Sequence, residues 1–394
     1  MTATESNNVS LTRRIIRALA LAALLAVAVG FLVFGMNSQD TGKRDFVEYW
    51  AAGKLLVGGQ NPYDSASILQ LERQAGSTRA EAQVSFSPPV ALLFALPLGY
   101  MNARWGAVFW MLAIVLSLVA SIQILKSLYL SKDDRIHQLG YLFAPVFACL
   151  MVGQLDLFFL LVLALFLKFH AERPFLAGLV LFPLATKPHL FLPFTLVLLA
   201  CSIYRREFRV LIGGMCGLAA SLMVIFAIDP RAWSQYFHTL RTVQPMHLFI
   251  PTWSVQLRAF IDPTAAWLQF IPEAGCCIWA LWYFWTRRNR WSWAEHGAAV
   301  LLVSVVCAVY AWFYDEVIVL PAIFATLKRR EETGGSLIPF GIIALPALLE
   351  VMWRVDLADV FYLWTTPAWL AWYVYVMAAS TPSANDRVAA ERVA

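Results

Sequence analysis

The stretch RDFVEYWAAGKLLVGGQNPYD, residues 44–64, concentrates acidic, basic and aromatic side chains between two apolar segments. Asp45 and Glu48 are three positions apart, so on a helix both carboxylates lie on one face. Partial removal from water at the mouth of a membrane cavity makes a carboxylate a better general base. The same pattern also fits a helix on the membrane surface, whose acids face water and whose aromatic side chains lie in the interfacial belt.

The end of this stretch predicts a turn followed by a second element. Gly-Gly-Gln-Asn-Pro is rich in turn formers, and Tyr63 and Asp64 come directly after it. The candidate substrate-binding residues around Asp45 are Glu48, Tyr49, Tyr63 and Asp64.

A lysine lies between two apolar runs in the sequence ATKPHL, residues 185–190. A lysine at membrane depth is costly unless it is paired or hydrated. Lys187 is therefore either a snorkelling interfacial residue or a ligand for a phosphate, to which an ammonium contributes a compact charge. His189 either assists that ligand or caps a helix.

A short polar group, GQLD, precedes another apolar run at residues 153–156. The amide of Gln154 and the carboxylate of Asp156 suit the hydroxyl groups of a sugar. Helix N-capping by Asp156 explains the same residue equally well.

The sequence FYDE places Tyr314, Asp315 and Glu316 at the edge of a further apolar run. Two adjacent carboxylates that face lipid would be expensive. We therefore expect at least one of them to face a cavity or a partner, and Tyr314 and Asp315 are candidate substrate-binding residues.

A second long polar passage, residues 229–263, mixes arginine and histidine with tryptophan and tyrosine. Arginine binds phosphate through two parallel hydrogen bonds, and aromatic rings stack on sugar faces. Arg258 is the candidate phosphate ligand in this passage. An amphipathic surface helix on anionic lipid has the same composition.

The sequence lacks the motifs that identify several common catalytic and ligand-binding sites. It contains no P-loop, no GxGxxG, no HExxH and no GxSxG motif, and it lacks an Asp-x-Asp metal pair. None of its six cysteines forms a CxxC pair. We expect no metal, no cofactor and no nucleic-acid partner.

The elements that must position these residues are membrane helices. The chain has 394 residues, of which 60% are hydrophobic and 14% are charged. Soluble domains are about 45–50% apolar and about 25% charged. We therefore predict an all-α integral membrane protein, a polytopic bundle of about twelve transmembrane helices with further helices in its outer loops.

Hydrophobic runs define the candidate spans, since about 20 apolar residues cross a bilayer as a helix. The candidates are 15–36, 86–101, 105–129, 137–152, 155–169, 174–186, 189–204, 208–228, 264–286, 296–311, 313–327, 336–352 and 357–379. The run 86–101 is rich in proline, which favours a broken or re-entrant element over a full crossing.

Basic clusters set the expected orientation, because cytoplasmic loops collect lysine and arginine. We expect a cytoplasmic N-terminus at 1–14 that precedes a signal anchor, since the first apolar run is too long for a signal peptide. A single membrane domain then covers 15–379, with 37–84 and 229–263 as outer loops. A disordered cytoplasmic tail, 380–394, follows.

The order of these motifs resembles that of glycosyltransferase family 87, within the GT-C superfamily. The residues that carry the resemblance are DFVEYWAAGKLLVGGQNPYD at 45–64, SPP at 87–89, GQLD at 153–156, KP at 187–188 and YDEVIVLPA at 314–322. Together they extend over residues 45–330. The first motif is fairly specific. The other motifs are weak individually and support the resemblance mainly through their common order.

The resemblance implies a membrane hexosyltransferase like the α-1,2-mannosyltransferases, with a GT-C-like bundle and an outward-facing cavity. The donor would be a polyprenyl-phosphate-sugar and the acceptor a glycan or glycolipid, at the outer face of a bacterial plasma membrane. Asp45 falls at the catalytic base of the family, and Lys187 lies at the KP motif that lines the cavity. A lipid or solute transporter and a non-catalytic envelope-assembly protein are the competing functions.

Overall fold

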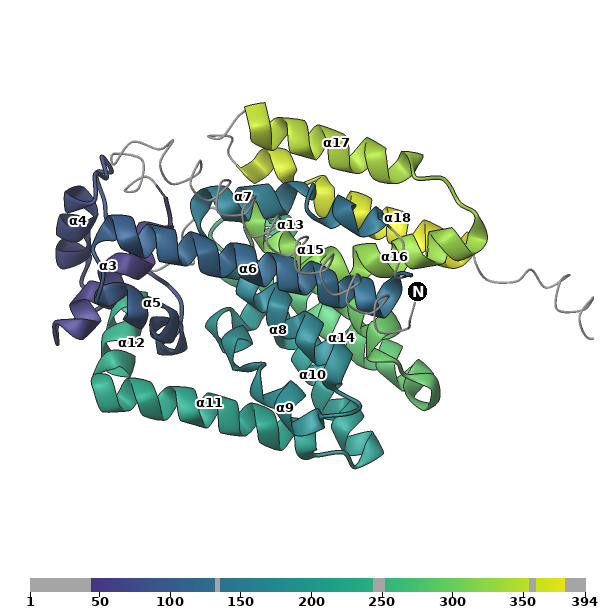
Figure 1. Cartoon of the computed structure of the whole chain (residues 1–394), viewed down its shortest axis with the longest axis horizontal. Coiled ribbons are helices and arrows are strands. Elements are labelled where there is room, and N and C mark those ends of the chain that lie inside the picture. Colours follow the sequence, from purple (N-terminus) through teal and green to yellow (C-terminus); the bar gives the residue numbers. More distant parts are fainter. Residues whose placement is uncertain (1–43, 132–134, 244–251, 354–358, 380–394) are drawn as a thin grey trace, which may run out of the picture. The chain divides into compact units, whose positions relative to one another are not determined.

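A computed structural model describes residues 44–131, 135–243, 252–353 and 359–379, and every regular element in these ranges is helical (Figure 1). The expected signal anchor at 15–36, the N-terminus at 1–14 and the tail at 380–394 lie outside the described residues. The described residues form two compact units: the first contains 44–85 and 94–113, and the second contains 86–93 and the residues from 114 onward.

Three described helices are long and apolar enough to cross a membrane: α6 (Ala103–Tyr129), α10 (Pro188–Arg205) and α11 (Arg209–Ile228). The 20 residues of α11 correspond to about 30 Å of helix, the thickness of the bilayer core. Shorter apolar helices lie at Pro89–Gly99, Pro174–Thr186, Trp293–Cys307 and Ile338–Met352. The described part of this membrane protein is all-helical, and the number of twelve crossings stays a prediction.

Unit 1 is built from α3 (Phe46–Val57), α4 (Ser65–Gln74), most of α5 (Leu92–Gly99) and the start of α6. The backbones of α3 and α5 touch, because a Cβ on Gly53 would lie 2.1 Å from the carbonyl oxygen of Ala95. With eight residues, α5 is about 12 Å long, too short to cross a bilayer. The prediction that 86–101 is a broken element agrees with this length.

The aromatic side chains of α3 form the core of unit 1. Tyr49 stacks on Trp110, with ring centroids 5.2 Å apart, and Phe46 lies 6.5 Å from the same ring. Trp50 donates its indole N–H to the carbonyl oxygen of Met101 over 3.0 Å. These rings are packed inside unit 1 against α6 and are not exposed on its surface, and their position in the interfacial belt stays a prediction.

Unit 2 holds the remaining elements, in which η marks a short 3₁₀ or π helix. They are η1 (Pro89–Ala91), η2 (Ile136–Gly140), α7 (Ala144–Val152), α8 (Asp156–Phe169), α9 (Pro174–Leu179), η3 (Phe182–Thr186), α10, α11, α12 (Ala232–Val243), α13 (Trp253–Ile261), η5 (Ala266–Gln269), α14 (Phe270–Arg287), η6 (Arg288–Arg290), η7 (Trp293–Gly297), α15 (Ala298–Cys307), η8 (Phe313–Val319), α16 (Leu320–Thr333), α17 (Ile338–Trp353), η9 (Asp359–Tyr362) and α18 (Thr365–Ala379).

Glycines bring α9 and α11 together along unit 2 (Figure 1). A Cβ on Gly178 would lie 1.9 Å from the carbonyl oxygen of Val210, and one on Gly213 would lie 2.0 Å from that of Phe175. Such backbone contact is typical of small residues in membrane helix pairs. The short helix α9 is therefore held against a helix long enough to span the bilayer.

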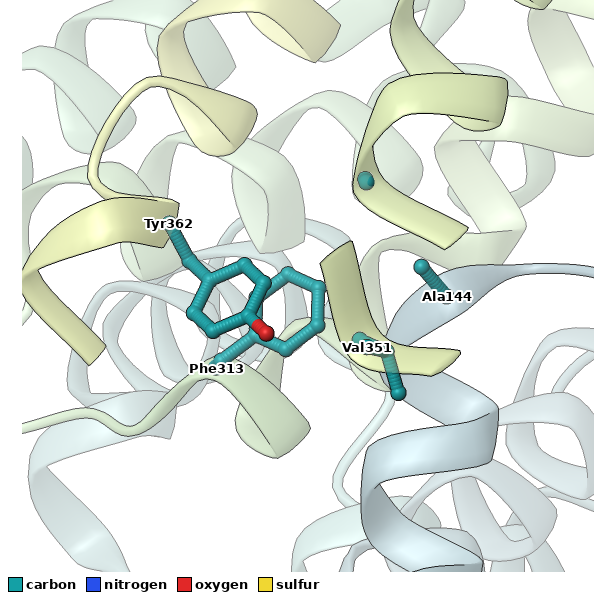
Figure 2. Close-up of a cluster of buried hydrophobic side chains, with 5 residues drawn as sticks. Ala144, Phe313, Val351 and Tyr362 are labelled. Atoms are coloured by element: carbon teal, nitrogen blue, oxygen red, sulfur yellow. The ribbon is translucent and has the colours of Figure 1, made fainter. Parts of the chain in front are cut away.

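The helix η8 lies in the interior of unit 2, packed on α7, α8 and α15. Its Val317 and Ile318 are fully buried. At its start, Phe313 stacks on Tyr362 with ring centroids 3.9 Å apart, in a cluster with Ala144 and Val351 (Figure 2). This packing fixes the turn that carries Tyr314, Asp315 and Glu316.

Candidate active site

Asp45 occupies the N-cap position of α3, and its half-buried side chain makes contacts beyond its own helix. Gln83 donates from its side-chain nitrogen to Oδ1 of Asp45 over 2.6 Å. Arg79 places Nη2 3.7 Å from the same oxygen. Asp45 does not cap α3 with its side chain, so its carboxylate is oriented by the loop that follows α4.

The same loop also binds a second carboxylate, that of Glu72 on α4. The backbone N–H of Gln83 donates to both oxygens of Glu72, over 3.1 and 3.3 Å, and the Gln83 carboxamide oxygen accepts a bond from Arg79. Glu72 is fully buried, and burial raises its pKa although the Gln83 N–H and Arg79 lower it. Unit 1 thus contains a network of Asp45, Arg79, Gln83 and Glu72.

The other candidates in the first motif have packing or capping roles. Tyr49 and Tyr63 are 4% and 2% exposed. Asp64 is the N-cap of α4, as its side chain accepts from the backbone N–H of Ser67 over 2.9 Å, and bonds from Ser67 lower its pKa. Glu48 is half-buried on the first turn of α3. Their predicted contacts with substrate stay predictions.

Lys187 lies at the centre of a buried ion cluster in unit 2. Its Nζ lies 3.1 Å from both carboxylate oxygens of Asp156 and 2.5 Å from Oδ1 of Asp315. Both aspartates are fully buried and Lys187 is 7% exposed. Two carboxylates therefore face one ammonium. The three residues come from three separate sequence motifs, which the fold brings to one point.

Helix ends bring the three charges together. Gly153 ends α7 with a φ of +78°, a conformation that suits glycine, and Asp156 is the first residue of α8. Asp315 in the first turn of η8 accepts from the backbone N–H of Trp312 over 2.6 Å. The N-terminal ends of helices favour negative charge. The N-cap residue of α8 is Leu155, so the capping interpretation of Asp156 was wrong.

Aromatic rings surround this ion cluster. The Tyr314 ring centroid lies 5.1 Å from Lys187 Nζ, within the range of a cation–π contact. His189 meets Tyr310 edge-on, with centroids 5.4 Å apart, and its buried Nε2 has no hydrogen-bond partner among the described residues. Gln154, two residues before Asp156, is buried, and its backbone oxygen accepts from the Cys149 thiol.

A family model identifies the chain. The model of glycosyltransferase family 87 matches residues 86–312, more than half of the chain. The chain belongs to glycosyltransferase family 87. It is therefore a glycosyltransferase embedded in a membrane. No match was found among curated proteins or among solved structures.

The matched range of this glycosyltransferase includes part of the candidate set. It contains Gln154, Asp156, Lys187, His189 and Arg258. It begins after the motif with Asp45 and ends before Tyr314 and Asp315. The assignment of these three residues to the site therefore depends on the resemblance of their motifs and on their geometry.

Arg258 is buried in the glycosyltransferase and does not lie on an exposed helix face. It is 4% exposed on α13, and its Nη1 donates to the side-chain oxygen of Gln269 over 2.8 Å. The alternative of an amphipathic surface helix on anionic lipid therefore does not fit this residue. No group of three or more histidine, cysteine or acidic side chains among the described residues is arranged to hold a metal.

Sequence reasoning missed Glu72, Arg79 and Gln83. They lie on a polar helix and in an irregular loop, where no periodicity connects them with Asp45. The single available signal was the wealth of polar residues in the loop after α4.

Proposed function

We propose that this family 87 glycosyltransferase moves a hexose, with mannose as the first choice, from a polyprenyl-phosphate-sugar to an acceptor hydroxyl. The reaction takes place at the extracytoplasmic face of a bacterial inner membrane and inverts the anomeric centre. The family membership supports sugar transfer, and the three long apolar helices support a membrane-bound donor.

Asp45 is the general base in this proposal. The acceptor oxygen attacks the anomeric carbon while Asp45 takes the hydroxyl proton. The bond between that carbon and the lipid phosphate breaks, and the polyprenyl phosphate leaves with the electron pair. One carboxylate suffices because the phosphate is already a good leaving group, in contrast to the carboxylate pair of glycosidases.

One observation carries the assignment of Asp45: its carboxylate is half-buried and is held by a side-chain bond of 2.6 Å from Gln83. A base must be positioned before its proton affinity matters. Arg79 and Gln83 supply that positioning from a loop, while the core of unit 1 fixes α3.

Lys187 and Arg258 are the candidate cations for the lipid phosphate, and both assignments stay predictions. Lys187 already faces two carboxylates at 3.1 Å or less, so its ammonium has little charge to offer a phosphate. This geometry favours a role for Lys187 in holding Asp156 and Asp315 in place.

The test is transfer of labelled mannose from polyprenyl-phosphate-mannose by the purified protein and by its Asp45→Asn variant. A positioned base contributes about 10²–10⁴-fold to the rate, so we expect a loss of that size. Glu81→Gln, an exposed acid in the same loop, is the matched control and should retain activity.

Near-normal transfer by Asp45→Asn would remove this residue from the role of base. No transfer from mannose, glucose or arabinose donors by a folded wild-type protein would refute the proposed reaction and favour transport or a scaffolding role.

A further inference from the structure

A pocket in unit 2 is lined by residues that the expected site does not include. It lies between the start of α13, the end of α15, the first turn of η8 and the segment that joins η9 to α18. Its volume is about 30 Å³, about twice what one water molecule needs. The polar lining residues are Thr252, Glu316 and Thr366, and the aromatic ones are Trp253, Trp312, Phe313 and Tyr362.

Glu316 brings a buried carboxylate to this pocket. It is 5% exposed, and Thr365 donates its hydroxyl to Oε1 over 2.6 Å. Its neighbour Asp315 is bound to Lys187, so consecutive acids serve two different sites. As a lining residue, Glu316 offers carboxylate oxygens to a ligand that donates hydrogen bonds.

The aromatic side chains of the pocket are fixed by bonds to the protein. Trp253 donates its indole N–H to the carbonyl oxygen of Leu363 over 2.7 Å, and Trp312 donates to the Tyr310 hydroxyl over 2.8 Å. Tyr362 is stacked on Phe313 (Figure 2). Since both indole N–H groups are engaged, the two tryptophans present apolar ring surface to an occupant.

The size and charge of the pocket restrict the occupant. The enclosed space has room for about two water-sized groups, such as sugar hydroxyls, and Trp253, 46% exposed, offers a flat surface beside it. A phosphate group would meet the like charge of Glu316 at short range, which is unfavourable. A neutral polyhydroxyl group satisfies both the carboxylate and the aromatic walls.

We propose that this pocket binds the hydroxyl edge of a neutral sugar of the acceptor, with Glu316 accepting hydrogen bonds from its hydroxyls and Trp253 packing on its ring. The inference rests on the proposed function, since it takes the substrate of the transferase to be a glycan. It adds Glu316 and Trp253 to the candidate substrate-binding residues and assigns them to the acceptor.

Binding can be measured without catalysis. The purified full chain, in a detergent without a sugar head group, is examined by saturation-transfer NMR with methyl α-D-mannopyranoside, and with mannose 1-phosphate as the charged probe. We expect the wild type to bind the neutral glycoside and to discriminate against the phosphate.

Glu316→Gln keeps the size of the side chain and an oxygen for Thr365, but loses the charge. Loss of a hydrogen bond to a charged group weakens binding roughly ten- to a hundredfold, so we expect this variant to bind the glycoside more weakly by that factor. In the transfer assay its acceptor KM should rise by a similar factor, with an unchanged donor KM. Trp253→Leu, at an exposed position, should also weaken binding and decides the matter if Glu316→Gln does not fold. Glu331→Gln, at an exposed site on α16, is the control.

Absence of binding by the wild type, or binding that neither variant weakens, would overturn the pocket assignment and leave the proposed function standing. Conversely, binding that depends on Glu316 and Trp253, in a protein that transfers no sugar from any donor, would retain the pocket and refute the proposed reaction.

Discussion

At the scale of single residues, the loop residue Gln83 controls two carboxylates at once. Its side chain binds Asp45 and its backbone N–H binds Glu72. The buried Glu72 is thereby connected to the proposed base through one residue. A change in the charge of Glu72 should therefore affect the stability of unit 1.

Glu72→Gln should stabilise the protein at neutral pH. Because burial raises the pKa of Glu72 in the folded state, its stabilising contribution is fully present below the unfolded pKa, about 4.3, and is lost as the pH rises through the folded pKa. Glutamine stays neutral and avoids this loss. We expect thermal unfolding in detergent to show a higher Tm for the variant at pH 7 and a shrinking difference toward pH 4.

Glu81→Gln is the control for that measurement, because Glu81 is exposed in the same unit. It should change Tm little at any pH. A Glu72→Gln variant that is less stable than the wild type at pH 7 would contradict the prediction.

Lys187→Met should destabilise the protein strongly, by about 3–5 kcal/mol, since removal of one partner leaves buried charges uncompensated. Adding Asp156→Asn to Lys187→Met should recover part of the loss, because the two residues share one cluster and their effects are not additive. The measurement is Tm or resistance to denaturant of the purified variants. Equal stability of single and double variants would argue against the ion cluster as described.

At the scale of elements, glycine positions separate close helix packing from open helix surface. Gly213 faces the backbone of α9 and would place a Cβ 2.0 Å from the Phe175 carbonyl oxygen, whereas the adjacent Gly214 would place one 3.7 Å from Gly178. The two residues have the same helical context, so they form a matched pair.

Gly213→Ala should destabilise the protein by about 1–3 kcal/mol or more, as expected for a clash in a packed interface. Gly214→Ala should be neutral or slightly stabilising, because alanine is the better helix former. Thermal unfolding of both variants in one detergent compares them directly. A larger loss for Gly214→Ala would show that α9 and α11 do not pack through Gly213.

Hydropathy predicted the long elements well and the interior turn poorly. The expected spans 189–204 and 208–228 correspond to α10 (Pro188–Arg205) and α11 (Arg209–Ile228), because lipid-exposed helices must be apolar over their whole length. The expected span 313–327 instead begins as the short helix η8. Its Val317 and Ile318 are apolar because protein surrounds them, and a hydropathy profile does not distinguish protein from lipid.

The candidate site was predictable only where a motif stood between apolar runs. Asp156, Lys187 and Asp315 were each predicted separately, and the expectation that an acid of FYDE faces a partner or cavity is confirmed by the ion pair between Lys187 and Asp315. Their meeting was not predictable, because pairing between residues 128 positions apart leaves no local pattern.

At the scale of the whole molecule, composition and motif order indicated the class of the protein. The membrane class follows from its 60% hydrophobic residues, and the family prediction is confirmed by the match over residues 86–312. The face of the membrane, the donor and the count of crossings depend on the surrounding bilayer and on ligands, and they stay predictions.

The positions of its three charges along the sequence determine when the ion cluster of Lys187 can form during synthesis. Asp156 and Lys187 are 31 residues apart, and Asp315 follows Lys187 after 128 residues. At about 5–20 residues per second, the first two charges leave the ribosome within a few seconds of each other, and the third follows about 6–26 seconds later. We expect Asp156 and Lys187 to enter the bilayer as a neutral pair, which Asp315 joins only when the C-terminal third is inserted.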